Sequence, residues 1–219
     1  MAYQIAIDGP AGAGKSTIAK KLAKELSFIY IDTGAMYRAM AIHFIRLSIN
    51  PIDKDAIEAA CQDVSVEIAF EDGVQQVLLN GENVTSMLRT EEVGNMASAT
   101  SIYPVVRAKL VELQRTLAAK TSVIMDGRDI GTCVLPDADL KIYLTASVEA
   151  RAKRRYDELL AKGEQPALED IAKDIEERDY RDMNRKVSPL KQAEDAVLVD
   201  SSDMGIDEVV KTILALKNR

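Results

Sequence analysis

The chain has 219 residues, enough to bury the core of one sizeable domain, and its 47% hydrophobic and 29% charged content is ordinary for a globular protein. A formal net charge of −7 argues against nucleic acid or an anionic membrane surface as partner, but allows a local cationic pocket. Two distant cysteines, Cys61 and Cys133, give no basis for expecting a zinc site or a disulfide framework. No secretion signal or membrane-length apolar run is recognised, so we expect a soluble, cytoplasmic protein.

The first part of the chain alternates strands and helices. Short apolar runs at 3–8 and 27–32 predict buried strands. An apolar residue at every fourth position predicts a helix over 15–26. Another helix begins near Thr33, which we expect to cap it. Its predicted core stripe is Met36, Met40, Phe44 and Leu47.

The pattern changes after a short helix expected at 53–62. Residues 64–86 alternate apolar and polar side chains around two turn signals, which predicts a small antiparallel hairpin or three-stranded sheet. The chain's single histidine, His43, lies among apolar residues at helical spacing, and we interpret it as a packing residue rather than a base.

The rest of the chain returns to alternating strands and helices. Helical character resumes near 87, and a long helix opens at Pro104. The following elements are expected at 122–127 and 140–146 (strands), 147–162 and 168–184 (charged helices), 196–200 (strand) and 205–217 (helix). The predicted inward residues of the long and last helices are Val106, Leu110, Leu113, Leu117, Ile206, Val209, Val210 and Ile213. We therefore expect an α/β fold with about five parallel strands and helices on both faces.

A phosphate-binding loop follows the first strand. "GPAGAGKST" matches the G-x-x-x-x-G-K-[ST] pattern between a strand and a helix, where backbone N–H groups and the helix N-terminus attract phosphate. Lys15 is expected to reach the outer phosphates and Ser16 to ligate Mg²⁺, with a weaker expectation for Asp126 at a later strand end. The predicted nucleotide-binding residues are Gly9, Pro10, Ala11, Gly12, Ala13, Gly14, Lys15, Ser16 and Thr17. The loop predicts ATP-type binding but leaves the phosphate acceptor open: water, a protein, a metabolite or another nucleotide.

Five motifs narrow the choice of acceptor. "IDGPAGAGKST", "IDTGAMYR", "LRTEEVGNMAS", "DGRDIGT" and "ERDYRDMNR" together resemble the cytidylate kinase family, nucleoside monophosphate kinases that phosphorylate CMP and dCMP from ATP. The resemblance includes the β-rich insertion and spans essentially the whole chain. Ser16 departs mildly from some relatives, which have Gly there, so the resemblance does not require a side-chain ligand for Mg²⁺ at this position.

The resemblance also implies a division of the chain and a set of site residues. It implies a P-loop NTPase-type core (1–32, 102–146 and 188–219), an acceptor-binding part (33–101) and a helical lid (147–187). The implied CMP-binding residues are Thr33, Tyr37, Arg38, Ser98, Arg107, Arg128, Asp129, Arg178, Asp182 and Arg185. The catalytic cations would be Lys15, Arg128, Arg154, Arg178 and Arg185.

These residue types suit the implied reaction. A carboxylate such as Asp129 or Asp182, helped by Ser98, would accept a hydrogen bond from the cytosine amino group and repel the uracil carbonyl. Arginines would hold the monophosphate. Simpler interpretations stay open: Thr33 can be only a helix cap and Tyr37 only a core residue.

The run "ERDYRDMNR" also has two interpretations. As a helix it places Arg178, Arg181 and Arg185 on one face, which is either a solvated surface neutralised by acidic neighbours of the same helix or a lid that closes over phosphates. Those acidic neighbours are Glu176, Glu177, Asp179 and Asp182. The phosphate loop favours the lid.

Other functions remain to be distinguished. A P-loop kinase could act on UMP, AMP or a shikimate-like metabolite, and a nucleotide-hydrolysing switch or an inactive binding module would share the loop. The guanine-reading Asn-Lys-x-Asp motif of GTP switches is missing from the sequence. We expect a monomer that binds small nucleotides, neither nucleic acid nor membrane.

Overall fold

The computed structural model describes residues 2–218, which form two compact units. Of the described residues, 3–28 and 122–218 form one unit, called unit 1, and Ile29–Thr121 form the other, called unit 2. Within the described residues, none of the helices is both long and apolar enough to cross a membrane.

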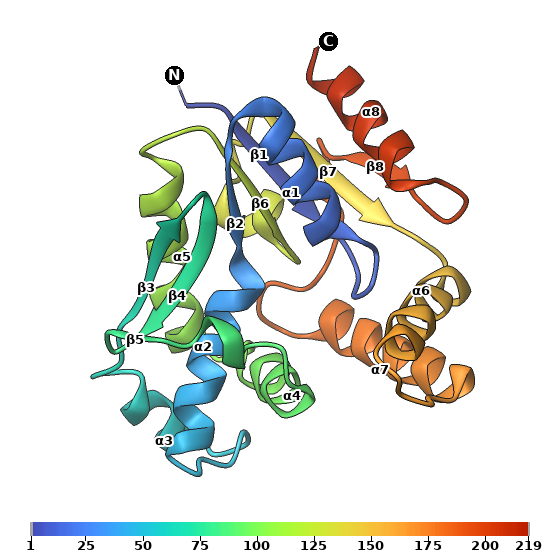
Figure 1. Ribbon diagram of the computed structural model, residues 1–219. Coiled ribbons are helices and arrows are strands. Elements are labelled where there is room, and N and C mark those ends of the chain that lie inside the picture. Colours follow the sequence, from blue (N-terminus) through green and yellow to red (C-terminus); the bar gives the residue numbers. More distant parts are fainter. Residues whose placement is uncertain (1, 219) are drawn as a thin grey trace. The chain divides into compact units, whose positions relative to one another are not determined.

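The larger sheet has the strand order β2-β6-β1-β7-β8, in which β2 is Ile29–Asp32 (Figure 1). Its strands β6, β1, β7 and β8 pair in parallel. In unit 1, β1 (Gln4–Asp8) pairs with both β6 (Val123–Gly127) and β7 (Leu140–Thr145), and β7 pairs with β8 (Val197–Asp200). Most residues of β1 and β6 are buried, as expected of strands in a parallel sheet that is covered on both faces. The α/β fold expected from the sequence is confirmed.

Helices α1 (Lys15–Leu26) and α8 (Ile206–Lys217) of unit 1 lie side by side (Figure 1). An ion pair between Lys21 and Asp207 joins them at the surface. Val209, Val210 and Ile213 are buried as predicted, but the prediction for Ile206 was wrong. Ile206 is 51% exposed because it opens the helix, before the buried stripe begins.

Helices α6 (Val148–Ala161) and α7 (Leu168–Asn184) form an antiparallel pair in unit 1 (Figure 1). A small apolar cluster of Ala152 on α6 with Ile171 and Ile175 on α7 holds them together. The rest of both helices is strongly charged, so the pair buries little apolar surface of its own. These are the two helices that the sequence indicates as a lid.

Unit 2 combines helices with a separate antiparallel sheet. It contains β2 (Ile29–Asp32), α2 (Thr33–Arg46), α3 (Lys54–Ala60), β3 (Val66–Glu71), β4 (Val74–Leu79), β5 (Glu82–Asn83), η1 (Thr85–Met87), α4 (Glu91–Thr100) and α5 (Pro104–Ala118). Strands β3, β4 and β5 form a three-stranded sheet in that order. The predicted insertion at 64–86 is therefore confirmed as antiparallel β structure.

Several local predictions for unit 2 need correction. The cap of α2 is Asp32, whose carboxylate accepts a hydrogen bond from the Ala35 N–H, and Thr33 is the first helical residue. Leu47 ends the helix and is 53% exposed, so it is not part of the core. On α5, the stripe predicted to run through Leu113 and Leu117 lies one position further along. These two residues are only half-buried, and the buried positions beside them are Val111, Gln114 and Ala118.

Candidate functional site

The phosphate loop of unit 1 is shaped by glycines. Gly9 follows β1 with a φ of 153°, and a Cβ placed there would lie 1.9 Å from the carbonyl oxygen of Leu144 on β7. No residue with a side chain fits at that point, because the loop passes directly over the neighbouring strand. Gly14 has a left-handed conformation (φ 84°) and caps α1, so the loop runs straight into the helix N-terminus that would face phosphate.

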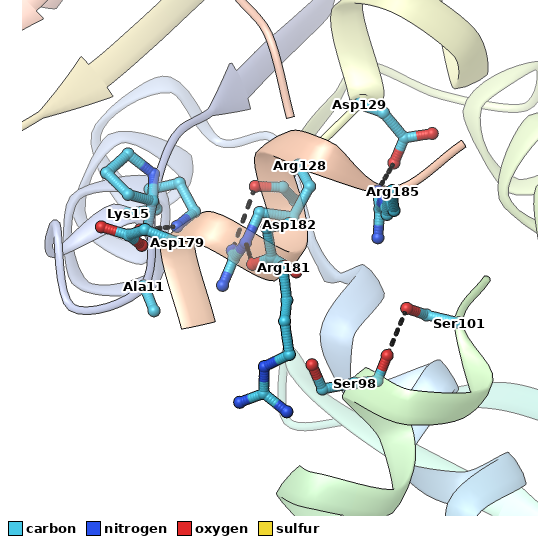
Figure 2. A network of polar contacts seen from close by, with 12 residues as sticks. Ala11, Lys15, Ser98, Ser101, Arg128, Asp129, Asp179, Arg181, Asp182 and Arg185 are labelled. Atoms are coloured by element: carbon cyan, nitrogen blue, oxygen red, sulfur yellow. Dashed lines mark hydrogen bonds and ion pairs between the residues drawn. The ribbon is translucent and has the colours of Figure 1, made fainter. Parts of the chain in front are cut away.

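Lys15 is buried at the start of α1. Its ammonium group donates a hydrogen bond to the Pro10 carbonyl at 2.7 Å, within the loop itself (Figure 2). Burial, followed by the positive charge of Arg128, lowers the pKa of Lys15 well below its ordinary value. A phosphate bound in the loop would favour the charged form of this lysine, so its environment suits an anionic ligand.

Ser16 and Asp126 bring two oxygen ligands together. The Ser16 hydroxyl donates to Asp126 Oδ2 at 2.8 Å, and Asp126 lies on the buried part of β6. A hydroxyl and a carboxylate suit Mg²⁺, which takes few protein ligands in phosphate sites. Over residues 2–218, no group of three or more His, Cys, Asp or Glu side chains could form a metal cage, so an ion here would depend on nucleotide and water for its other ligands.

Arg128 begins the loop after β6 and pairs with α7. Its Nε donates to Asp182 Oδ2 at 2.7 Å (Figure 2). Burial opposes both charges, but each partner offsets it: Asp182 raises the pKa of Arg128, and Arg128 with Arg178 and Arg185 lowers the pKa of Asp182. The pair is therefore charged at neutral pH.

Asp129 contacts α7 in the same way, with the charges exchanged. Its Oδ1 lies 3.6 Å from Nη2 of Arg185, the C-terminal cap of α7 (Figure 2). Arg185 also donates from Nε to the Ser188 carbonyl at 2.6 Å. Four of the predicted acceptor residues thus meet in unit 1 as two reciprocal ion pairs. Each joins the 128–129 dipeptide to the C-terminal part of α7.

A third ion pair joins α6, α7 and the phosphate loop. Arg151 on α6 is buried; its Nη1 lies 2.7 Å from Asp179 Oδ2 and donates to the Ala11 carbonyl at 2.9 Å, and its Nε donates to the Ala146 carbonyl at 2.9 Å. Neither Arg151 nor Asp179 was predicted as a site residue. The pairing also adds to the sequence interpretation of α7: Asp179 and Asp182 pair directly with arginines of other elements, Arg151 and Arg128. Arg178 and Arg185, at the same end of α7, also favour the charged form of Asp182.

The arginine-rich face of α7 divides in the structure. Arg178 and Arg185 are partly buried, whereas Arg181 is exposed. Arg154, expected to join them from α6, donates instead to the carbonyl and hydroxyl oxygens of Ser201 after β8. The sequence therefore identified the basic helices correctly, but the structure gives each arginine a different environment.

Unit 2 contains the other predicted acceptor residues. Arg107, buried on α5, lies with its guanidinium carbon 5.8 Å from the centre of the Tyr37 ring on α2, a cation–π arrangement. A Cβ placed at Gly34 would lie 3.1 Å from Arg38 Nη1, so Arg38 folds back over the first turn of α2. Thr33 is buried.

Ser98 and the start of α2 also belong to unit 2 and contain predicted acceptor residues. Ser98 is half-buried on α4, and its carbonyl accepts a hydrogen bond from the Ser101 hydroxyl at 3.0 Å (Figure 2). The main chain of Asp32, just before Thr33, is held by Gln75 of β4: its N–H donates to the amide oxygen at 2.8 Å, and its carbonyl accepts from the amide nitrogen at 3.2 Å. The carboxylate of Asp32 also pairs with Arg89 at 2.8 Å.

Comparison with known proteins decides the family. A sequence model of the cytidylate kinase family matches residues 5–219. The chain belongs to the cytidylate kinase family. It is 48% identical over 216 residues to the cytidylate kinase of Carboxydothermus hydrogenoformans, covering 99% of this chain and 97% of that protein. It is 52% identical over 213 residues to the cytidylate kinase of Listeria innocua, covering 97% and 94%.

Solved structures support the fold of this cytidylate kinase family member. A shikimate kinase from Bacteroides thetaiotaomicron aligns with a TM-score of 0.51 at 12% identity, covering 99% of both chains. A gluconokinase from Sinorhizobium meliloti aligns with a TM-score of 0.52 at 13% identity, covering 99% of this chain and 92% of that one. At such identities the likeness shows the fold alone.

The residues missed by sequence reasoning share a property. Asp8, Arg151, Asp179 and Gln75 bind the main chain or a charged partner far away in the sequence. Asp8 stands directly before the phosphate loop and Arg151 sits in the basic run "ARAKRR", but such signals do not identify a partner. Only the distances between these side chains and their partners in the folded chain identify those partners.

Proposed function

We propose that this chain transfers the γ-phosphate of ATP to CMP or dCMP, giving CDP or dCDP, with Mg²⁺ assistance and closure of an arginine lid. The observation that carries the proposal is the register of β1 and β6, in which Asp8 lies opposite Gly127. The phosphate loop and the Arg128–Asp129 dipeptide therefore begin at adjacent strand ends, where ligands of parallel α/β sheets bind. The relatives named above are cytidylate kinases, which supports CMP as the acceptor.

The donor side uses the loop from Gly9 to Thr17. Its backbone N–H groups and the start of α1 would bind the ATP phosphates, and Lys15 would contact the outer ones. Ser16 and Asp126 would hold Mg²⁺, directly or through water, and the ion would neutralise charge on the transferring phosphate. Arg151 fixes the loop main chain at Ala11, so it would keep the phosphate site in shape.

The residues proposed for the acceptor side are those that the family resemblance implies. Arg38, Arg107 and Arg128 would bind the CMP phosphate, and Thr33 and Tyr37 would help to position the nucleotide. Asp129, with the Ser98 hydroxyl, would read the cytosine amino group. Asp182, which accepts a 2.7 Å hydrogen bond from Arg128, is the alternative carboxylate for this role.

The reaction needs no side-chain base. The second pKa of a phosphate monoester is about 6, so the attacking oxygen of CMP is already ionised at neutral pH. The difficulty is the repulsion between two anionic phosphates, which positioning and positive charge overcome. Arg154, Arg178 and Arg185 of the α6–α7 region would supply that charge, and lid closure would exclude the water that otherwise hydrolyses ATP.

An acceptor panel tests the proposal. ADP release from ATP and Mg²⁺ is measured with CMP, dCMP, UMP, AMP, shikimate or no acceptor. CMP or dCMP should give the highest kcat/KM, and turnover without acceptor should be slow. Faster turnover with UMP or AMP would overturn the acceptor assignment, and ATP hydrolysis that no acceptor stimulates would favour the switch.

One substitution tests the base-reading residue within the same panel. Asp129→Ala should reduce the preference for CMP over UMP by about tenfold, because a hydrogen-bonded charged group contributes discrimination of about 1–3 kcal/mol. The exposed Asp139→Ala is the control. Unchanged selectivity in Asp129→Ala would remove that residue from base recognition.

A further inference from the structure

Asp8 binds the loop that carries the proposed acceptor residues. It is the last residue of β1 and is 5% exposed. Its Oδ1 accepts a hydrogen bond from the Ile130 N–H at 2.8 Å, and its Oδ2 accepts one from the Gly131 N–H at 2.7 Å. Both donors are main-chain groups directly after Arg128 and Asp129. One buried carboxylate thus holds the position where that dipeptide ends.

Strand pairing alone does not fix this segment. The β1–β6 ladder ends at the Asp8–Gly127 pair, one residue before Arg128. Beyond it the chain forms a single π-helical turn, η2 (Ile130–Val134), whose first N–H groups have no partner within the turn. Asp8 satisfies the first two of them, so its carboxylate acts as the cap that sets where the turn begins.

The segment has little space in which to shift. A Cβ added at Gly131 would lie 3.1 Å from Cδ of Lys141 and 3.5 Å from Oδ2 of Asp8. Lys141 is itself held, because its ammonium group pairs with Asp195 at 2.7 Å. Gly131 therefore lets the main chain approach the Asp8 carboxylate, and movement of that carboxylate would be passed to the chain at Asp129.

The charge of Asp8 is kept at a cost. Burial is the largest influence and raises its pKa to about 6, although the two N–H donors and Lys15 favour the anion. At neutral pH the fold therefore holds a carboxylate where a neutral group would be easier to bury. Buried charges maintained against desolvation are concentrated at functional sites, which supports a role beyond packing.

We propose that Asp8 is a positioning residue for phosphoryl transfer: it fixes Arg128 and Asp129 relative to the phosphate loop that begins at Gly9. Asp8 is covalently attached to the donor loop and hydrogen-bonded to the acceptor loop, so it sets the spacing between the two sets of groups. The inference rests on the proposed assignment of Arg128 and Asp129 to CMP. It assigns Asp8 no contact with either nucleotide.

Asp8→Asn tests the inference with little change in volume. Asparagine keeps one acceptor but turns an NH₂ group toward a main-chain N–H, which forces the loop to move. A displacement of about 1 Å can cost about 100-fold in rate, so kcat/KM for CMP should fall by about that factor. ATP affinity, measured by calorimetry, should change less than about threefold, because the loop glycines and Lys15 are retained.

The deciding readout is the ratio of kcat/KM for CMP to that for UMP. A ratio does not depend on the fraction of folded enzyme, so a merely structural role cannot change it. Displacement of Asp129 should lower the ratio at least about fivefold in Asp8→Asn. Gly131→Ala, which displaces the same loop from the other side, should lower it in the same direction. The exposed Asp139 also accepts a main-chain hydrogen bond from β1, and Asp139→Asn should leave the ratio unchanged.

Three results would overturn the inference: an unchanged rate, an equal loss for CMP and UMP, or a change in Asp139→Asn as large as in Asp8→Asn. These failures are distinct from failure of the proposed function, which would appear as a wild-type enzyme that does not prefer CMP. If the wild type prefers CMP and Asp8→Asn retains that preference, the role of Asp8 alone is rejected.

Discussion

Asp8 should also make the free energy of unfolding depend measurably on pH. Its pKa is about 6 in the folded protein against an ordinary 3.8. At ~1.4 kcal/mol per pH unit, this difference amounts to about 3 kcal/mol of unfolding free energy. The direction of the pH dependence follows from proton binding: between about pH 4 and pH 6 the folded chain holds a proton that the unfolded chain has released. The stability that Asp8 contributes is therefore present at low pH and is lost as pH rises through the folded pKa.

Asp8→Asn removes this titration. Relative to wild type, the variant should therefore gain stability as pH rises, by about 2 kcal/mol between pH 4 and pH 7. Any constant loss from the altered hydrogen bonds shifts the whole curve without changing this slope. Stability is the better observable than rate here, because the CMP phosphate itself titrates near pH ~6 and would dominate a pH–rate profile.

The assay is urea unfolding of both proteins at matched pH values. Circular dichroism is the suitable signal, since the chain contains no Trp. Asp139→Asn serves as the control, because it removes an exposed carboxylate that bonds the same strand. A stability difference between Asp8→Asn and wild type that stays constant within about 0.5 kcal/mol from pH 4 to pH 7 would refute the reasoning, and with it the view that the fold maintains a costly charge at this position.

Three further outcomes are expected. Arg178→Ala should lower kcat by about 100-fold or more while changing CMP affinity less. In Arg181→Ala, which alters an exposed residue, kcat should stay within about threefold of wild type. Equal effects of the two substitutions in steady-state assays would indicate that this face of α7 is an ordinary solvated surface. Gln75→Leu should lower the free energy of unfolding in urea by about 2 kcal/mol and raise KM for CMP, because two hydrogen bonds to Asp32 are lost. Gln76→Leu, which loses a hydrogen bond from Asn83, should not raise KM. Ser16→Ala should raise the Mg²⁺ concentration needed for half-maximal rate, and an unchanged Mg²⁺ titration would exclude side-chain ligation there.

Local patterns in the sequence predicted most of the fold. The elements of the sheet and its helices were recognisable because hydrophobic periodicity and glycine turns act over a few residues. The phosphate loop was recognisable for the same reason: the geometry that binds phosphate is formed by consecutive residues. Three errors fell at helix ends, at Thr33, Leu47 and Ile206, where one position decides whether a side chain faces the core or water. The core stripe of α5 was misplaced by one position within the helix.

The candidate site was predictable only in part. Family motifs pointed to Arg128, Asp129, Asp182 and Arg185, but the sequence did not show that they form two reciprocal pairs. The acidic residues of α7 were read as local neutralisers, because charges three and four positions apart on a helix are neighbours. In the structure two of them, Asp179 and Asp182, form ion pairs with arginines on other elements.

By itself, the sequence determined which residues form the phosphate loop, where the strands and helices lie, and to which family the chain belongs. Tertiary structure decided which charges meet. Arg151 reaches Ala11 across 140 positions, and Asp8 reaches Ile130 across 122. Burial then made those contacts consequential, because a charge removed from water needs a specific partner, and only the folded chain determines which partner lies within reach.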